Sequence, residues 1–365
     1  MTQQTLPKIN INLEKIAHNT EKLLHLYGSK GIGVMGVTKT VCGDPIIANL
    51  MVDKGIKFLT DSRIINLKKM YHARVKAQFV LLRTPSLSEI DATIKYADIS
   101  VNTELTIVKR LSTCAIKQHM VHKIILMVEM GDLREGIMPS DLDDFVKEVL
   151  KLAGIKIVGI GTNFACFGGV KPNQAKMNQL SSLVRQVERK FGISIPIVSG
   201  GSSANYNWFM DTGDVGKVNN LRLGESIYLG REPLNRMPIQ GLYTDAFTFI
   251  GEVIESKVKP SKPYGELGQD AFGNYPQFLN KGYMKRAIIG VGNQDVLVKG
   301  LTPVQDFEIL GSSSDHIILD TKDNDLKVGD EVAFQLNYGA LLATMTSPYI
   351  VKNYQYQSSK IVQHQ

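Results

Sequence analysis

The sequence predicts an α/β fold in which a (β/α)8 barrel of the TIM type is followed by a smaller, mostly β domain. Before about residue 232, short β-branched runs alternate with longer amphipathic segments, a rhythm typical of strands that each precede a helix. Eight such repeats over about 220 residues match the size of a (β/α)8 barrel. A doubly wound open sheet has the same alternation, so the periodicity alone does not choose between the two folds.

The elements follow in order along the chain. Helical patterns separate the strands, for example at 44–54, 63–71, 103–114, 141–152 and 174–190. The eight predicted strands lie at residues 32–38, 56–60, 78–83, 98–101, 123–128, 156–161, 195–199 and 219–223.

The pattern changes after Pro233, where residues 233–238 are typical of a linker. Apolar runs then follow one another with turn residues between them, for example at 246–250, 287–291, 317–319 and 331–334. Such runs predict strands. We therefore expect the barrel at residues 1–234 and a C-terminal β domain at residues 235–365.

Composition narrows the class of protein. The formal net charge is +7, but the basic residues are scattered and match no nucleic-acid-binding motif. The chain has no apolar run long enough to span a membrane. Met1 to Pro7 lacks the features of a secretory signal, and the three cysteines are widely spaced and odd in number, which favours the cytoplasm. No cysteine or histidine cluster indicates a metal site.

Polar residues follow the predicted strands at their carboxyl ends, where barrel enzymes carry their chemistry. Each could separately cap a helix, but all eight ends are polar. The residues concerned are Lys39, Asp61, Arg83, Asn102, Glu129, Thr162 with Asn163, Ser199 to Ser203, and Arg222.

Lys39 ends the first barrel strand. A lysine at a strand end can reach solvent, but a lysine neutralised by burial is a nucleophile toward carbonyls and the usual anchor of pyridoxal phosphate (PLP). On the seventh strand, Gly200 and Gly201 let the backbone approach a ligand, and Ser202 and Ser203 offer hydroxyl and N–H groups before a helix. This is an anion cradle at the place where barrels most often bind phosphate.

Nearly the whole chain resembles the alanine racemase family of PLP enzymes, and within it the ornithine racemase branch. Val37 to Lys39 is similar to the family's cofactor-lysine motif, and Val128 to Gly136 to its arginine-bearing loop after strand five. Gly161 to Ala165 corresponds to a segment whose histidine stacks on the cofactor ring. Arg222 to Gly230 resembles the family's most recognisable motif, whose arginine faces the pyridine nitrogen.

In the β domain, Pro263 to Gly265 is similar to the catalytic-tyrosine motif and Ser314 to His316 to a loop near the substrate. The resemblance thus implies PLP as cofactor and a homodimer with shared active sites. With the cradle, the implied catalytic residues are Lys39, Tyr264 and Arg134; the cofactor-binding residues are Lys39, Asn163, Gly201, Ser202, Ser203, Arg222, Gly224 and Tyr228; and the substrate-binding residues are Arg134, Ser314 and Asp315.

The chain departs from the family pattern at four positions. Gly43 replaces a tyrosine, Asn163 the stacking histidine, Met127 a lysine and Ser347 a tyrosine. We expect these changes to leave room for a side chain longer than a methyl group. Asp132, Glu135, Glu266 and Asp270 are all candidates to bind its terminal ammonium.

The implied reaction is racemisation by two bases, with Lys39 on one face of the substrate Cα and Tyr264 on the other. A tyrosine acts as a base only when a cation stabilises its phenolate, and Arg134 is the candidate. We expect an amino acid as substrate, ornithine or another basic one. The alternatives are an alanine or broad-specificity racemase, a non-catalytic PLP-binding protein, and a decarboxylase or aldolase on the same scaffold.

Overall fold

The computed structural model describes residues 6–356, which divide into two compact units. One unit comprises residues 15–244 and the other residues 6–14 and 245–356. The predicted boundary after residue 234 is therefore corrected to residue 244. Residues 6–14 belong to the second unit because the strand Lys8–Asn12 pairs with strands of that unit, although it lies at the other end of the chain. Residues 1–5 and 357–365 of the predicted domains lie outside the described part.

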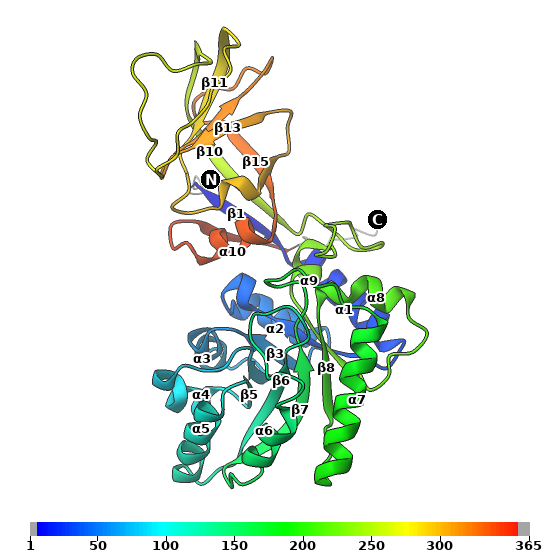
Figure 1. Cartoon of the computed structure of the whole chain (residues 1–365). Coiled ribbons are helices and arrows are strands. Elements are labelled where there is room, and N and C mark those ends of the chain that lie inside the picture. The colour runs from blue at the N-terminus through cyan, green and yellow to red at the C-terminus, as the bar shows by residue number, and fades with distance from the viewer. Residues whose placement is uncertain (1–5, 357–365) are drawn as a thin grey trace, which may run out of the picture. The chain divides into compact units, whose positions relative to one another are not determined.

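The larger unit is a closed barrel of eight parallel strands, which confirms the barrel over the open sheet (Figure 1). All eight predicted strands are present, each within three residues of its predicted start and end. The barrel strands are β2 (Gly33–Val37), β3 (Phe58–Asp61), β4 (Gln78–Leu81), β5 (Ile99–Asn102), β6 (His122–Val128), β7 (Ile155–Thr162), β8 (Ile197–Ser202) and β9 (Asn220–Leu223).

Helices connect successive strands and surround the barrel in Figure 1. The α-helices of this unit are α1 (Leu13–Gly28), α2 (Pro45–Asp53), α3 (Ile64–His72), α4 (Ile90–Tyr96), α5 (Leu105–Lys117), α6 (Leu142–Val149), α7 (Gln174–Phe191), α8 (Tyr206–Asp211) and α9 (Glu225–Leu229). Three short 3-10 helices, η1 (Lys39–Val41), η2 (Leu87–Glu89) and η3 (Ser203–Asn205), follow β2, β4 and β8.

The barrel interior is a packed apolar core. Met35, Val80, Val101, Ile125 and Met127 belong to one buried cluster contributed by β2, β4, β5 and β6. Packing is tight enough that a Cβ on Gly161 would lie 3.0 Å from the Ser199 Cβ and 3.1 Å from the Met127 Sδ. Met127 therefore fills the core below the barrel mouth, and the expected extra room at this position is wrong.

The second unit is a mostly antiparallel sheet, as predicted. Its strands pair in the order β12-β15-β10-β11-β14-β13, and β1 joins β10 to β16. The elements are β1 (Lys8–Asn12), β10 (Phe247–Pro260), β11 (Tyr283–Ile289), η4 (Val298–Gly300), β12 (Leu301–Pro303), β13 (Glu308–Ser312), β14 (Ile317–Asp320), β15 (Glu331–Leu336), α10 (Tyr338–Thr346) and β16 (Val351–Gln355).

The predicted linker at 233–238 is instead an ordered turn of the barrel unit. The buried carboxylate of Glu232 accepts hydrogen bonds from the backbone N–H groups of Leu234, Asn235 and Met237. Arg231 forms an isolated antiparallel bridge with Pro238. A single acidic side chain thus holds a Pro-containing segment whose composition indicates a linker.

Across residues 6–356, every helix is too short or too polar to cross a bilayer.

One buried histidine makes the stability of the barrel dependent on pH. His122 begins β6, is 2% exposed and lies 2.8 Å from the Ser100 hydroxyl through its Nε2. Burial lowers the pKa of His122 from 6.5 to about 4. Between these pH values the unfolded chain binds a proton that the folded chain does not, so stability falls as the pH falls.

We predict that His122 lowers the free energy of unfolding by up to about 3 kcal/mol between pH 7 and pH 4. Urea unfolding of the wild type and of His122→Gln across this range measures the effect. The variant should show a smaller loss of stability with acidification, since glutamine keeps a hydrogen-bonding group but does not titrate. Parallel pH profiles for the two proteins would contradict the prediction.

Candidate active site

The candidate site is an arc across five neighbouring strands at their carboxyl ends. Lys39 begins η1, separated from the end of β2 by Thr38, and Arg222 lies in β9 opposite Met35 of β2 and Ser202 of β8. Asn163 follows β7, which pairs with both β8 and β6. The barrel thereby brings together residues that are 183 positions apart in the chain, as between Lys39 and Arg222 (222 − 39).

Arg222 is buried, with 5% of its surface exposed. Its Nη2 donates to the Thr162 carbonyl (2.8 Å) and to Asn163 Oδ1 (2.6 Å), and its Nη1 donates to the Ser199 hydroxyl. Burial lowers the pKa of Arg222 to about 10, so the guanidinium remains charged at neutral pH. It presents donors and no acceptor to any ligand beside it.

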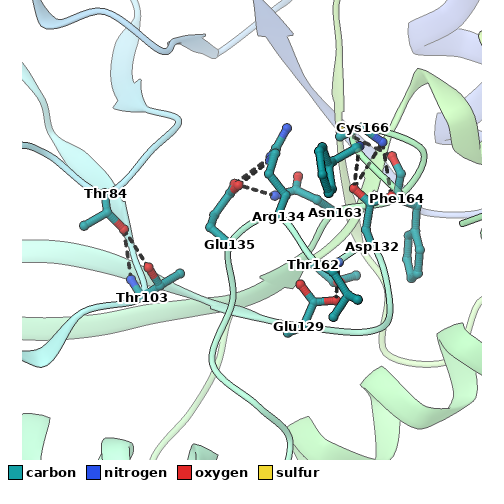
Figure 2. Close-up of polar contacts among 12 residues, drawn as sticks. Thr84, Thr103, Glu129, Asp132, Arg134, Glu135, Thr162, Asn163, Phe164 and Cys166 are labelled. Carbon is teal, nitrogen blue, oxygen red and sulfur yellow. Dashed lines mark hydrogen bonds and ion pairs between the residues drawn. The ribbon is translucent and has the colours of Figure 1, made fainter. Parts of the chain in front are cut away.

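Arg134 and Glu135 lie beside Asn163 in Figure 2. The Arg134 Nε and Nη2 donate to the two carboxylate oxygens of Glu135. The Asn163 side-chain amide donates to Glu135 Oε1 at 3.0 Å. Asn163 therefore bridges Glu135 and Arg222, so the position aligned with the stacking histidine makes hydrogen bonds at both ends of its amide.

Two other acidic residues of this loop have structural roles. Glu129 is buried, and its Oε1 accepts from the N–H groups of Gly131 (2.5 Å) and Leu133 (3.0 Å). Asp132, 1% exposed, accepts from the N–H groups of Cys166 and Phe167, the latter at 2.9 Å. Asp132 thus ties the loop after β6 to the loop after β7 (Figure 2).

A buried acidic group supports the segment that carries Lys39. The Thr38 hydroxyl donates to Asp61 Oδ2 at 2.8 Å, and Asp61 Oδ1 accepts from the Arg63 N–H and the Asn66 side chain. Burial raises the pKa of the Asp61 carboxyl, while these hydrogen bonds and the positive charge of Lys39 oppose the rise. Lys39 itself is half-buried at the start of η1.

The predicted anion cradle is a tight turn at the end of β8. Gly201 has φ +137°, and the Asn205 side chain closes the turn by accepting from Ser202 N–H and donating to the Gly200 carbonyl, both at 3.0 Å. The Ser202 side chain caps η3. Ser203 Oγ lies 3.0 Å from Ser226 Oγ and so joins the cradle to α9.

Gly224 and Tyr228 of the predicted cofactor motif both contact β2, but in different ways. Gly224 packs against β2, because a Cβ there would lie 3.1 Å from the Val37 Cβ. Tyr228 is fully buried, and its hydroxyl donates to the Val37 carbonyl at 2.9 Å. This position corrects the prediction that Tyr228 contacts the cofactor, since the ring instead supports the strand that leads to Lys39.

The expected space at Gly43 is occupied. Gly43 has φ +56°, and a Cβ there would lie 2.8 Å from the Asn66 Cβ and 2.9 Å from its backbone carbonyl oxygen. Ser347, in the other unit, is also buried and donates to Asp295 at 2.6 Å. Neighbouring groups therefore occupy the space at Gly43 and Ser347, and the prediction of an enlarged pocket is wrong at both positions.

Three predicted site residues belong to the β-sheet unit. Tyr264 is 90% exposed, on the segment between β10 and β11. Ser314 and Asp315 are exposed and bonded to each other at 2.6 Å, between β13 and β14. The barrel arc itself contains Lys39, Arg134, Asn163, Gly201, Ser202, Ser203, Arg222 and Gly224.

Sequence reasoning missed three supporting residues: Asn205, Ser226 and Thr38. Asn205 stands three residues after Ser202, the spacing of a capping box, and that signal was available. In the described residues, no group of three or more His, Cys, Asp or Glu side chains could hold a metal ion.

The arc contains three basic side chains from three different strand ends, Lys39, Arg134 and Arg222. Opposite it, the Thr84 and Thr103 hydroxyls that follow β4 and β5 pair at 2.9 Å (Figure 2). A lysine amine, a glycine turn closed by Asn205 and a donor-only guanidinium together fit a phosphorylated aldehyde whose ring nitrogen accepts a hydrogen bond.

Comparison with known proteins shows which proteins the chain resembles. The family profile "Alanine racemase, N-terminal domain" matches residues 11–232. The chain is 41% identical to the ornithine racemase of Acetoanaerobium sticklandii, over 95% of this chain and 99% of that protein. It is 39% identical to the lysine racemase of Thermotoga maritima, over 96% and 98%. The alanine racemase of Bacillus anthracis with bound L-Ala-P has the same fold, with a TM-score of 0.75, 13% identity and coverage of 98% and 97%.

We predict that Gly201→Ala weakens PLP binding by about tenfold or more. An alanine Cβ would lie 2.2 Å from Asn205 Oδ1 in a backbone conformation that favours glycine, so the turn must open. Titrating the apoprotein with PLP and following visible absorbance measures the affinity. Gly28→Ala is the matched control, since a Cβ there meets nothing within 4 Å. Equal PLP affinity in both variants would exclude the cradle.

Proposed function

The chain belongs to the alanine racemase family and is an amino-acid racemase, and from that premise we propose that it uses PLP and interconverts the enantiomers of ornithine or another basic amino acid. The observation that carries the substrate assignment is similarity over nearly the whole chain to one ornithine racemase and one lysine racemase. The alanine racemase of Clostridium tetani matches at 22% identity over 88% of this chain, and that of Clostridium novyi at 27% over 42%.

The barrel arc supports PLP as the cofactor. Lys39 would hold its aldehyde, the turn at Gly201 to Ser203 its phosphate, and Arg222 its ring nitrogen. When bound, PLP acidifies the Cα–H of an attached amino acid. Arg222 offers donors only, so it favours a ring nitrogen without a proton. This arrangement supports proton exchange at Cα and disfavours reactions that need a stronger electron sink.

The chain's own groups move the proton. Lys39 Nζ serves one face of the substrate Cα, and the Tyr264 hydroxyl serves the other. Each removes a proton in one direction of the reaction and donates one in the reverse direction, with a contribution of about 10²–10⁴-fold in rate. Arg134 binds the substrate carboxylate, and its charge stabilises the phenolate. Ser314 and Asp315 complete the substrate-binding set.

The segment that carries Tyr264 supports a homodimer with shared sites. Tyr264, Leu267, Phe272, Tyr275 and Leu279 all have at least half of their surface exposed. Exposed apolar side chains at this density are typical of a surface that another protein covers. We therefore propose that Tyr264 acts at Lys39 of the partner subunit.

Hydrogen bonds within the loops support two of the four candidate carboxylates for the substrate's terminal ammonium. Asp132 accepts backbone N–H groups from the loop after β7, and Asp270 accepts those of Phe272 and Asn274. Both carboxylates are therefore engaged in loop structure. Glu135 and Glu266 remain as candidates. Among the described residues, Cys42, Cys114 and Cys166 form no disulfide bond, which is typical of a cytoplasmic protein.

A racemisation screen tests the proposed function. With PLP added, kcat/KM for ornithine or lysine should exceed that for alanine by about 10²-fold, since an unmatched charged group costs a few kcal/mol and each 1.36 kcal/mol is tenfold. Chiral chromatography of both enantiomers of ornithine, lysine, arginine, alanine and serine measures this. Lys39→Ala should abolish activity with every substrate while the fold is kept. Alanine or serine as the best substrate would contradict the assignment.

Mixing two inactive variants tests whether the tyrosine acts in the partner's site. Lys39→Ala and Tyr264→Phe chains should each be inactive, but a mixed dimer has one site with both native residues. After subunit exchange, activity should recover to about a quarter of the wild-type value, since half of the dimers are mixed and each has one intact site. Proven exchange without recovery would place both residues in one subunit's site.

A further inference from the structure

We infer that Glu135 is the positioning residue of this site: it fixes the Arg134 guanidinium for the substrate carboxylate and, through Asn163, couples Arg134 to the buried Arg222. The inference rests on the proposed function, because it assumes that Arg134 binds an amino-acid carboxylate. It differs from that proposal in assigning Glu135 to Arg134 rather than to the substrate's terminal ammonium.

The hydrogen bonds around Glu135 form a continuous chain. Its Oε2 accepts from Arg134 Nε, and its Oε1 accepts from both Arg134 Nη2 and Asn163 Nδ2. The other end of the Asn163 amide accepts from Arg222 at 2.6 Å. A two-oxygen contact with Arg134 fixes the plane of the guanidinium as well as its position, which a single contact would not do.

Electrostatics favours this assignment. Burial is the largest influence lowering the pKa of Arg222, and the charge of Arg134 acts in the same direction, while Glu135 opposes it. Two guanidinium groups that repel each other thus share one acidic neighbour. The Arg134 and Glu135 side chains are 37% and 27% exposed, so solvent screens the pair only in part.

Among the described residues, no acidic side chain other than Glu135 forms an ion pair or hydrogen bond with Arg134. Glu129 and Asp132 accept backbone N–H groups of the surrounding loops. Below the loop, Met127 and Val128 end β6 as buried apolar side chains. The ion pair of Arg134 within the described residues is with Glu135, and the two are adjacent in the chain, so the loop carries its own counterion.

The test compares Glu135→Gln with a matched surface variant, Glu148→Gln. Glu148 also forms an ion pair with a nearby basic residue, Lys151, but lies on α6 outside the site. We expect Glu135→Gln to raise KM for ornithine by about tenfold or more with a smaller change in kcat, since glutamine keeps the side-chain size but loses the charge that holds Arg134. Glu148→Gln should match the wild type.

A ligand without a carboxylate separates the two possible roles of Glu135. The diamine 1,4-diaminobutane is ornithine without its carboxylate, and its inhibition constant reports the amine contacts alone. If Glu135 acts through Arg134, Glu135→Gln leaves this constant unchanged. An inhibition constant that rises as much as KM would instead show that Glu135 binds the terminal ammonium, and would overturn the inference.

A direct binding measurement keeps the result decisive. Calorimetric titration of the holoenzyme with α-methylornithine, which has a carboxylate but no Cα–H, should show the same tenfold loss of affinity in Glu135→Gln. Unchanged KM and affinity in a folded, PLP-loaded variant would also overturn the inference. A wild-type protein that racemises no amino acid would defeat the proposed function itself, which is a different outcome.

Discussion

The burial of the Arg222 guanidinium is the constraint on which the site depends. A guanidinium stays charged, so a buried one must have its donors satisfied by acceptors fixed in place. β7 and β8 supply them, through the Thr162 carbonyl, the Asn163 amide and the Ser199 hydroxyl. Because the Asn163 oxygen faces Arg222, its amide nitrogen is directed toward Glu135. One buried charge thereby sets the orientation of groups on three adjacent strand ends.

In the loops, acidic side chains accept hydrogen bonds from backbone N–H groups that have no partner in a helix or sheet. Glu129, Asp132 and Glu232 each accept two or more backbone N–H groups of irregular segments. Buried N–H groups need partners, and a carboxylate can accept several at once. Most acidic residues near the barrel mouth are therefore committed to structure, and this limits the number that can meet a substrate.

The two units contribute different chemistry to the proposed reaction. The barrel supplies the amine, the anion cradle and the guanidinium groups on a packed apolar floor. The β-sheet unit supplies an exposed tyrosine on a segment with many exposed apolar side chains. Catalytic groups on rigid strand ends keep their geometry, and a surface segment can be ordered by a partner. A shared site would make racemisation depend on assembly of the two subunits.

The sequence by itself determined the fold class, the strands of the barrel and the identity of the charged residues at their ends. Those features depend on local periodicity and on the rule that barrel chemistry lies after the strands, so Lys39, Asn163, Gly201 and Arg222 were predicted from the residues, whereas Arg134 was predicted from the family resemblance. The family resemblance added PLP and the role of Tyr264.

Only the tertiary structure decided which groups each residue packs against or hydrogen-bonds to. The first strand joins the β domain because it pairs with β10 and β16, which periodicity cannot reveal. Gly43 leaves no space because Asn66 packs against it, and Tyr228 supports β2 because its hydroxyl reaches the Val37 carbonyl. Glu135 could be recognised as acidic from the sequence, but its place between Arg134 and Asn163 depends on two loops 28 residues apart that only the closed barrel brings together.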